Sequence, residues 1–507
     1  MQSYEQLAEE NRELRAQLAE RDARIAELEA LLAGALKRIA DLEARLKTDS
    51  RTSSKPPSSD PPNAAARPKR PPSGRRRGGQ PGHRGTTRSL LPPEKVTHIV
   101  DLIPETCERC AAALAGNDSQ PIRSQVTDLP PVQPDVTEYR QHTLECQSCG
   151  AKTTAPLPPG VGASAFGPRL KAMLAACSGV LKLSRRTVEW LMENFHNVDI
   201  SLGSVSACEE AVSEAVAAPV EEARQHVWAS PGAYVDETGF RQAVQAEPQN
   251  QSEASDVDEP APDEGDAPNP SGKAWLWTAV TPLVTVFLVH AKRSAVAAAK
   301  LLGSFAGTLV SDRWSAYSFI DAARRQLCWA HLLRDFEWIA EFGAGASGIG
   351  RALVADAKLM FRWWHELKAG GLTRSGFQER MAPLMARVEA LIEQCAAGPH
   401  EKSAGRCRRI LTLRAALWTF VVREGIEPTN NAAERALRPA VIWRKLSFGS
   451  ASDRGSRFVE RILTVAATCR QQGRNVLDYL VAAFEAHACG EPAPSLLPQA
   501  AEQRLAG

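Results

Sequence analysis

The sequence predicts an α/β protein with a mixed sheet at its core and long helical segments before and within that core. Three observations lead to this prediction. Short apolar segments typical of strands cluster between residues 234 and 312. A heptad pattern of apolar residues covers residues 4–46. Apolar residues at helical spacing dominate residues 164–226 and 345–423.

Composition narrows the class of protein. The chain has 507 residues, 43% hydrophobic and 24% charged, which excludes a wholly disordered or fibrous protein. The longest apolar run, Leu283 to Val289, is too short to cross a bilayer, and the N-terminus does not have the pattern of a signal peptide. Eleven cysteines, an odd number, indicate reduced thiols or metal ligands. We therefore expect a cytoplasmic protein without a membrane partner.

The first 50 residues predict a coiled coil that pairs two copies of the chain. Eleven of thirteen seam positions are apolar, and β-branched residues at position a together with Asn11 favour a parallel dimer. The alternative is a single long helix that packs on its own protein. The a positions are Tyr4, Asn11, Leu18, Ile25, Leu32, Ile39 and Leu46, and the d positions are Leu7, Leu14, Arg21, Leu28, Ala35 and Leu42.

Residues 51–95 form a basic linker. Between residues 51 and 90 there are ten Lys or Arg, eight Pro and five Gly, against one acidic residue, Asp60. Such a segment cannot bury apolar area, and its charge predicts an arm that binds DNA phosphates, centred on Arg75, Arg76 and Arg77. A plain solubilising linker is the alternative.

Two cysteine pairs predict a zinc-binding domain over residues 96–156. Cys107 and Cys110 form one Cys-x-x-Cys pair, and Cys146 and Cys149 form the other. Four thiolates complete a tetrahedral site, which indicates structural Zn²⁺. Coincidental buried thiols are the alternative. The next segment, residues 157–227, predicts either a helix-turn-helix that binds DNA or an ordinary helical bundle.

The strand-like segments predict an RNase H-like catalytic domain over residues 228–445. Strands are expected at 234–240, 274–280, 284–289 and 308–312, with a crossover helix at 295–302. In that order, Asp236 lies on the first strand and Asp312 ends the fourth. A helix that begins near Asn430 carries Glu434, after a helical insertion at 345–423. An acidic loop, 242–272, interrupts the strands, and residues 446–507 predict a C-terminal helical region.

Three carboxylates from three elements suit Mg²⁺ or Mn²⁺, which take oxygen ligands and promote phosphodiester displacement in pairs about 4 Å apart. Helical spacing also puts Arg435 and Arg438 near Glu434, where they would contact phosphate. Each carboxylate has another interpretation. Glu237 rivals Asp236, Asp312 caps the next helix, and Glu434 pairs with Arg438.

Two further features leave their roles open. Cys328 and His331 have a spacing that suits a metal, but two ligands cannot complete a zinc site, so a satisfied core histidine is the preferred interpretation and a place near the active site the second. The acidic loop is either a solvated loop or a DNA mimic that occupies a basic groove.

The chain resembles the large transposase of the bacterial insertion-sequence family sixty-six over nearly its whole length. The motifs that carry the resemblance are the coiled coil, Arg77–His83, the cysteine pairs, Val235–Thr238, Ser311–Tyr317, Cys328–His331, Asn430–Pro439 and Arg444–Ser450. Arg444 and Lys445, in the last motif, join the candidate DNA-binding residues.

The resemblance implies an Asp-Asp-Glu triad of Asp236, Asp312 and Glu434. It further implies an enzyme that binds terminal inverted repeats, cleaves metal-dependently and joins the ends to target DNA, with small accessory proteins from the same element and an association with the nucleoid. Two other functions remain: a non-catalytic zinc-containing DNA-binding protein, and an RNase H-like nuclease that does not join strands.

Overall fold

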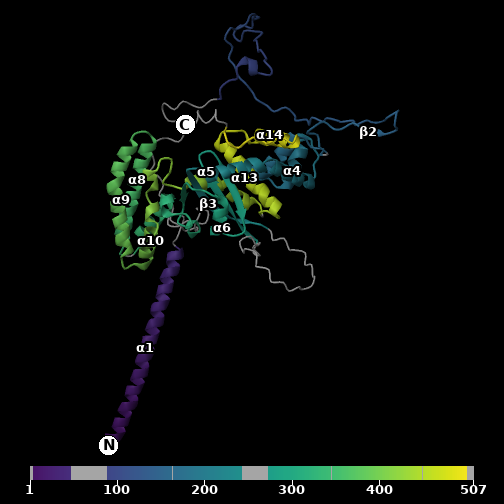
Figure 1. Ribbon diagram of the computed structural model, residues 1–507. Helices are drawn as coiled ribbons and strands as arrows, with labels where there is room; N and C mark the ends of the chain where they lie inside the picture. The colour runs from purple at the N-terminus through teal and green to yellow at the C-terminus, as the bar shows by residue number, and fades with distance from the viewer. Residues whose placement is uncertain are drawn as a thin grey trace. The chain divides into compact units, whose positions relative to one another are not determined.

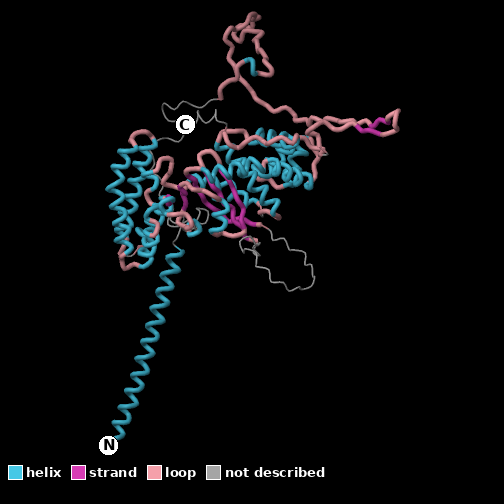
Figure 2. The backbone as a smooth tube through the Cα atoms, viewed as in Figure 1, coloured by secondary structure: helices cyan, strands magenta, loops and turns pink. Residues whose placement is uncertain are grey.

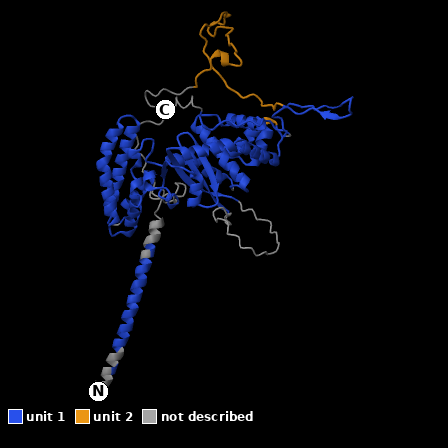
Figure 3. Ribbon diagram, in the orientation of Figure 1, with its two compact units in different colours: residues 1–64, 136–194, 198–507 blue, residues 65–135, 195–197 orange. Residues whose placement is uncertain are grey.

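A computed structural model describes residues 4–46, 88–162, 164–242, 272–343, 345–447 and 449–498. The chain forms two compact units (Figure 3), residues 65–135 with 195–197 and the remainder. Arg75, Arg76, Arg77 and nearly all of the acidic loop lie outside the described residues. Among the described helices, none is both long and apolar enough to cross a membrane.

A five-stranded mixed sheet is the centre of the larger unit (Figures 1 and 2). Its order is β5-β4-β3-β6-β7, with β3, β4 and β5 antiparallel and β6 and β7 parallel to β3. The strands are β3 (Gly232–Arg241), β4 (Lys273–Val280), β5 (Thr285–His290), β6 (Thr308–Ser311) and β7 (Arg325–Leu327). The first four strands and the crossover helix α6 (Ala295–Leu302) confirm the predicted positions to within two residues.

Strand β7 was missed because its sequence, Arg-Gln-Leu, is short and polar. The Arg325 and Gln326 side chains are nevertheless buried, and both form hydrogen bonds. Arg325 donates to the Ser311 hydroxyl and to the Asp312 carbonyl, and Gln326 donates to the Leu417 carbonyl. The buried Arg325 and Gln326 side chains of this strand therefore form hydrogen bonds with partners distant in the sequence. No periodicity in the sequence reveals such a strand.

Helix α13 (Asp453–Gln471) covers the edge of the sheet formed by β5. The amides of Thr285 and Phe287 on β5 donate to the Thr468 and Thr464 hydroxyls, each at 3.1 Å, and Val289 donates to Glu460 at 2.6 Å. Residues 460, 464 and 468 recur at helical spacing, so one face of α13 follows the edge strand. The free edge that could pair with another chain is thereby covered.

A second core lies in the helical insertion. Trp329, Phe336, Phe377 and Phe420 are fully buried in it, and it also includes strand residues such as Val310 and Leu327. Its helices are α7 (Trp329–Phe342), α8 (Ser347–Lys368), α9 (Arg374–Ala396), α10 (Glu401–Leu411) and α11 (Thr419–Val422). The predicted helical character of residues 345–423 is confirmed.

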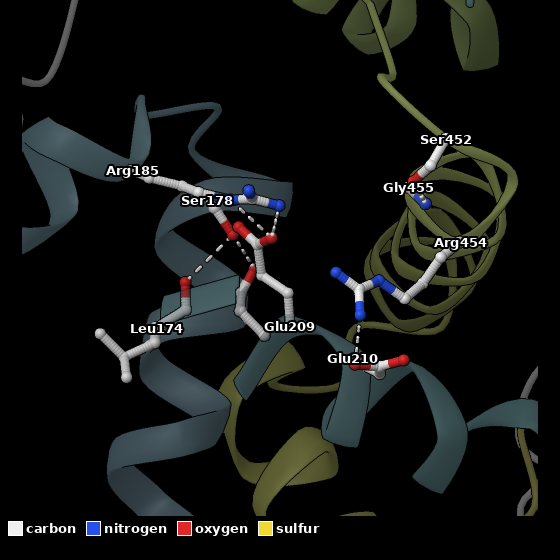
Figure 4. A network of polar contacts seen from close by, with 9 residues as sticks. Leu174, Ser178, Arg185, Glu209, Glu210, Ser452, Arg454 and Gly455 are labelled. Atoms are coloured by element: carbon white, nitrogen blue, oxygen red, sulfur yellow. Dashed lines mark hydrogen bonds and ion pairs between the residues drawn. The ribbon is translucent and has the colours of Figure 1, made fainter. Parts of the chain in front are cut away.

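The helices before the sheet pack with those at the C-terminus. The helices before the sheet are α2 (Pro168–Ala175), α3 (Arg185–His196), α4 (Leu202–Ala215) and α5 (Ala217–Ala229). The C-terminal helices are α13 and α14 (Val476–Ala488). Helix α4 contacts α2, α13 and α14. In Figure 4, Arg185 of α3 binds Glu209 at 2.6 Å and Arg454 of α13 binds Glu210 at 2.7 Å. Helix α4 is thus an acidic, packed helix, as the bundle interpretation expects.

The remaining regular elements lie before this bundle. Helix α1 (Tyr4–Leu46) is continuous over 43 residues, as the heptads predict. A short hairpin joins β1 (Thr143–Glu145) and β2 (Lys152–Thr154).

Candidate active site

The two aspartates lie on adjacent parallel strands. Strand β3 pairs with β6 in the register Tyr234 to Val310, and continuing that register by two residues puts Asp236 beside Asp312. Residues opposite each other in a parallel pair project to the same face of the sheet. Asp312 also accepts a hydrogen bond from the Trp314 amide at 2.9 Å. The alternative that Asp312 caps the following helix was wrong, because the short helix Ser315–Tyr317 begins after Trp314 and has no side-chain cap.

Glu434 comes to this edge on α12 (Asn431–Leu446), whose start is anchored to β3. The buried Asn430 side chain donates to the Val235 carbonyl at 2.6 Å, one residue before Asp236. The Asn430 amide donates to the Cys328 sulfur at 3.2 Å. The helix start was predicted correctly, but Asn430 does not cap it through its side chain. Instead, Asn430 ties the helix that bears Glu434 to the strand that bears Asp236.

The charges of neighbouring carboxylates act on Asp236. Burial raises the pKa of Asp236 well above its ordinary value, and the negative charges of Glu237, Glu434 and Asp312 raise it further. A divalent cation would relieve that repulsion, and carboxylate oxygens are the ligands that Mg²⁺ prefers. The residues present therefore fit a Mg²⁺ or Mn²⁺ site formed by Asp236, Asp312 and Glu434.

Glu237 has a structural role. Its carboxylate accepts hydrogen bonds from the Tyr317 hydroxyl at 2.7 Å and from Arg293 at 2.5 and 3.0 Å, and only 3% of its side chain is exposed. The Arg293 guanidinium lies 4.0 Å from the centre of the Trp314 ring. Burial raises the pKa of Glu237, while Tyr317 and Arg293 lower it. With both oxygens engaged, Glu237 is a poorer metal ligand than Asp236.

We expect Glu237→Gln to lower the free energy of unfolding by about 2 kcal/mol, because it removes a charge-assisted hydrogen bond from Arg293. The effect is limited to this size because the Arg293 side chain is partly exposed to water. Urea unfolding measures this. Glu221→Gln is the matched control, since Glu221 pairs with Arg224 at the surface, and its effect should stay below about 0.5 kcal/mol. Loss of divalent cation binding in Glu237→Gln would instead make Glu237 a ligand.

Cys328 and His331 lie at this site and are not a satisfied core pair. His331 Nδ1 lies 3.9 Å from Glu434 Oε1, and neither atom forms a hydrogen bond although both are buried. Burial lowers the pKa of His331 and raises that of Cys328 to about 11. The preferred interpretation, a core histidine with its hydrogen bonds satisfied, does not hold for Nδ1, and His331 instead faces Glu434.

The predicted basic residues separate into two groups. Arg435, Arg438 and Lys445 are exposed on α12. Arg444 instead donates to the Thr238 hydroxyl at 3.0 Å and to the Gly239 carbonyl at 2.8 Å, so it holds α12 against β3. Arg435 also lines a cavity of about 610 Å³ whose wall contains neither aspartate.

Each cysteine pair adopts the same local turn. In the first turn, the Cys107 amide donates to the Ala112 carbonyl, and the Ala111 amide donates to the Cys107 carbonyl. In the second turn, the Cys146 amide donates to the Ala151 carbonyl, and the Gly150 amide donates to the Cys146 carbonyl. Backbone amides in each turn lower the pKa of Cys107 and of Cys146, which favours thiolates. The first pair belongs to the smaller unit and the second to the larger one, and each turn by itself is suited to present two sulfurs to one ion.

Sequence reasoning missed the residues that hold the carboxylates in place: Asn430, Arg293, Tyr317 and Arg325. Their partners are 14 to 195 residues away in the sequence. The only signal in the sequence was the Asn-Asn pair that precedes Glu434.

Two parts of the chain match known protein families. Residues 163–457, which include the whole sheet, Asp236, Asp312 and Glu434, match the family described as Transposase IS66 family. Residues 4–89 match a family of unknown function (DUF6444). The chain is also 29% identical over 250 residues to the uncharacterized protein y4qI of Sinorhizobium fredii, and the match spans 44% of this chain and 46% of that relative. Because the first match covers more than half of its length, the chain belongs to the IS66 family of transposases.

Proposed function

We propose that the protein is a DNA transposase that binds the terminal inverted repeats of an insertion sequence and catalyses metal-dependent strand cleavage and strand transfer. One observation supports this most: Asp236 lies on β3, Asp312 directly follows the adjacent parallel strand β6, and Asn430 ties the helix that carries Glu434 to β3. The family match points to the same function.

The sheet supports an RNase H-like catalytic core. Three sequential antiparallel strands, a crossover helix and two parallel strands, in the order β5-β4-β3-β6-β7, are the arrangement expected of that fold. In it the first aspartate lies on the central strand and the second follows the neighbouring parallel strand, as Asp236 and Asp312 do.

The residues have separate tasks in the reaction. Asp236, Asp312 and Glu434 would hold Mg²⁺, which, when bound, stabilises the attacking and leaving oxygens of phosphodiester displacement. Asp236 would be one of the ligands, since its charge interacts with those of Asp312 and Glu434. Arg438 and Lys445, exposed on α12, would contact DNA phosphates near the scissile bond. Water attacks in the cleavage step, and the 3′-hydroxyl that results attacks target DNA in the joining step.

A plasmid that carries the native element ends, incubated with purified protein, Mg²⁺ and any accessory proteins of the element, tests this function. We expect nicks at the repeat ends followed by joined products, and neither product with Asp312→Asn. Nicks without joined products would favour a nuclease. DNA binding without either product would favour a non-catalytic DNA-binding protein.

From their spacing in the sequence, Cys107, Cys110, Cys146 and Cys149 would be ligands of structural Zn²⁺. We expect Cys107→Ser with Cys146→Ser to contain one Zn²⁺ per chain less than the wild-type protein. Elemental analysis measures the stoichiometry. Cys177→Ser changes a buried cysteine elsewhere and should keep the metal. Equal zinc content in all three proteins would contradict the assignment.

Helix α1 would pair two copies of the chain and so hold two element ends together. Its seam residues Leu18, Ile25 and Leu28 are 60%, 52% and 50% exposed, so the chain itself does not cover them. We expect Ile25→Lys with Leu28→Lys to convert a dimer into a monomer in sedimentation analysis. Glu27→Lys, off the seam, should remain a dimer. A wild-type monomer would refute this pairing.

A further inference from the structure

A cluster of three different ligand types lies beside the aspartates. One ligand atom each from Cys328, His331 and Glu434 lies within 4.8 Å of the other two. Among the described residues, this group meets the spacing of a metal site, and neither aspartate belongs to it. The facing atoms His331 Nδ1 and Glu434 Oε1 are buried, 3.9 Å apart and without a hydrogen bond. A buried pair in that state is expected to have a missing partner between its members.

The chemistry of the cluster differs from that of the three carboxylates. Thiolate and imidazole ligands select borderline and soft cations such as Zn²⁺ or Co²⁺, whereas Mg²⁺ prefers an all-oxygen site. Three protein ligands also leave the fourth tetrahedral position for water. The exposed fractions of the side chains fit that arrangement: Cys328 is buried at 1%, while His331 and Glu434 are 20% and 31% exposed. The His331 and Glu434 side chains are thus partly exposed, and the sulfur is buried.

The three ligands are held by rigid elements. Cys328 directly precedes α7, and His331 lies in its first turn. The Trp329 indole between them donates to the Leu417 carbonyl at 2.8 Å, and its amide donates to Pro428 at the same distance. Glu434 lies in the first turn of α12. The Asn430 amide, 3.2 Å from the Cys328 sulfur, joins the two helix starts. Binding a cation would thus need small side-chain changes and no movement of the backbone.

We propose that Cys328, His331 and Glu434 form a second metal site, specific for a thiophilic divalent cation such as Zn²⁺, that shares Glu434 with the catalytic carboxylates. A cation bound there would withdraw Glu434 from Asp236 and Asp312 and so inhibit Mg²⁺-dependent cleavage. The site itself depends only on the three ligands, whereas the inhibition rests on the proposed function.

Cobalt is the probe for the site. Full-length protein is titrated with Co²⁺, and the sulfur-to-cobalt absorption is recorded for wild type and for Cys328→Ser, His331→Gln and Glu434→Gln. We expect each variant to lose the same component of the spectrum, with Co²⁺ affinity reduced by more than about 100-fold. The paired cysteines contribute equally to all spectra and cancel in the differences. Cys469→Ala, a buried cysteine in α13, is the matched control and should keep the component.

Glu434→Gln keeps the test valid if the two α7 variants unfold, because Glu434 is partly exposed and the change conserves its shape. Superimposable spectra for wild type and Glu434→Gln would overturn the site.

The inhibition is tested separately by adding Zn²⁺ to the Mg²⁺-dependent nicking reaction. The nicking rate of each protein with Zn²⁺ is divided by the rate of the same protein without Zn²⁺. We expect micromolar Zn²⁺ to inhibit wild type at least tenfold more than Cys328→Ser. Equal inhibition of both would overturn the sharing of Glu434, and a protein without nicking activity would refute the proposed function while the cobalt spectra still decide the site.

Discussion

Asp236→Asn is expected to abolish strand cleavage and, in metal-free buffer, to make the protein more stable. Loss of one of the three proposed metal-binding carboxylates would remove several kcal/mol of transition-state stabilisation, so nicking should fall by about 10³-fold or more. The same change removes a buried charge that Glu237, Glu434 and Asp312 repel. The asparagine oxygen can still accept the hydrogen bond that Asp236 accepts from the Glu237 amide at 3.0 Å. Calorimetry should show an unfolding temperature about 2–4 °C higher than that of wild type.

The pH dependence has a definite sign. The folded state raises the pKa of Asp236, so folded protein binds more protons than unfolded protein between the two pKa values. That contribution to stability is fully present below the ordinary aspartate pKa of about 3.9 and is lost as the pH rises through the folded value. We expect metal-free wild type to lose stability over this range, and Mg²⁺ or Asp236→Asn to reduce the loss.

Asp321→Asn is the matched control for Asp236→Asn. Asp321 is exposed and accepts a hydrogen bond from the Ala323 amide, which asparagine preserves. Nicking and unfolding temperature should both stay at wild-type values. An Asp236→Asn protein that still nicks DNA, or that unfolds at a lower temperature, would contradict the carboxylate assignment.

Asn430→Ala is expected to affect both activity and stability. It removes the 2.6 Å hydrogen bond to the Val235 carbonyl, and a buried carbonyl left without a partner costs about 1–3 kcal/mol. It also loosens α12 against β3, and a misplacement of about 1 Å at a reacting centre costs roughly 10²-fold in rate. We expect nicking to fall by about that factor while Asp236, Asp312 and Glu434 all remain.

Two measurements distinguish a misplaced α12 from a less stable protein: the Mg²⁺ requirement of nicking and the free energy of unfolding. The Mg²⁺ concentration for half-maximal nicking should rise in Asn430→Ala, because the carboxylates no longer converge, and a merely less stable protein would not show this at low temperature. Asn194→Ala, on the exposed surface of α3, controls for the loss of an asparagine that donates to a local carbonyl. A normal Mg²⁺ requirement in Asn430→Ala would refute the positioning role.

Local patterns account for most of what could be predicted of the fold. The heptads of α1, the crossover helix α6 and the first four strands follow from the spacing of apolar residues. Strand β7 could not be predicted, since its three residues carry no pattern and depend on Arg325 and Gln326 finding distant partners. The packing of α4 could not be predicted either, because only contacts with α13 and α14 distinguish a bundle from a free recognition helix.

The candidate site divides in the same way. Asp236, Asp312 and Glu434 could be proposed from their order on successive elements, but the choice between Asp236 and its neighbour Glu237 could not. Strand alternation puts these two on opposite faces, and the sequence does not say which face is occupied by Arg293 and Tyr317. His331 was misjudged for a related reason, as its position opposite Glu434 depends on a helix about 100 residues later.

The α/β class, the first four strands of the sheet, the crossover helix, the three candidate carboxylates and the two cysteine pairs follow from residue type and short-range spacing. The folded chain was needed to see that Arg293 and Tyr317 bind Glu237, that Asn430 anchors α12 to β3, and that Cys328 and His331 face Glu434. These features depend on contacts between segments far apart in the chain. Burial and charge at such contacts are properties of the folded molecule, which local patterns do not encode.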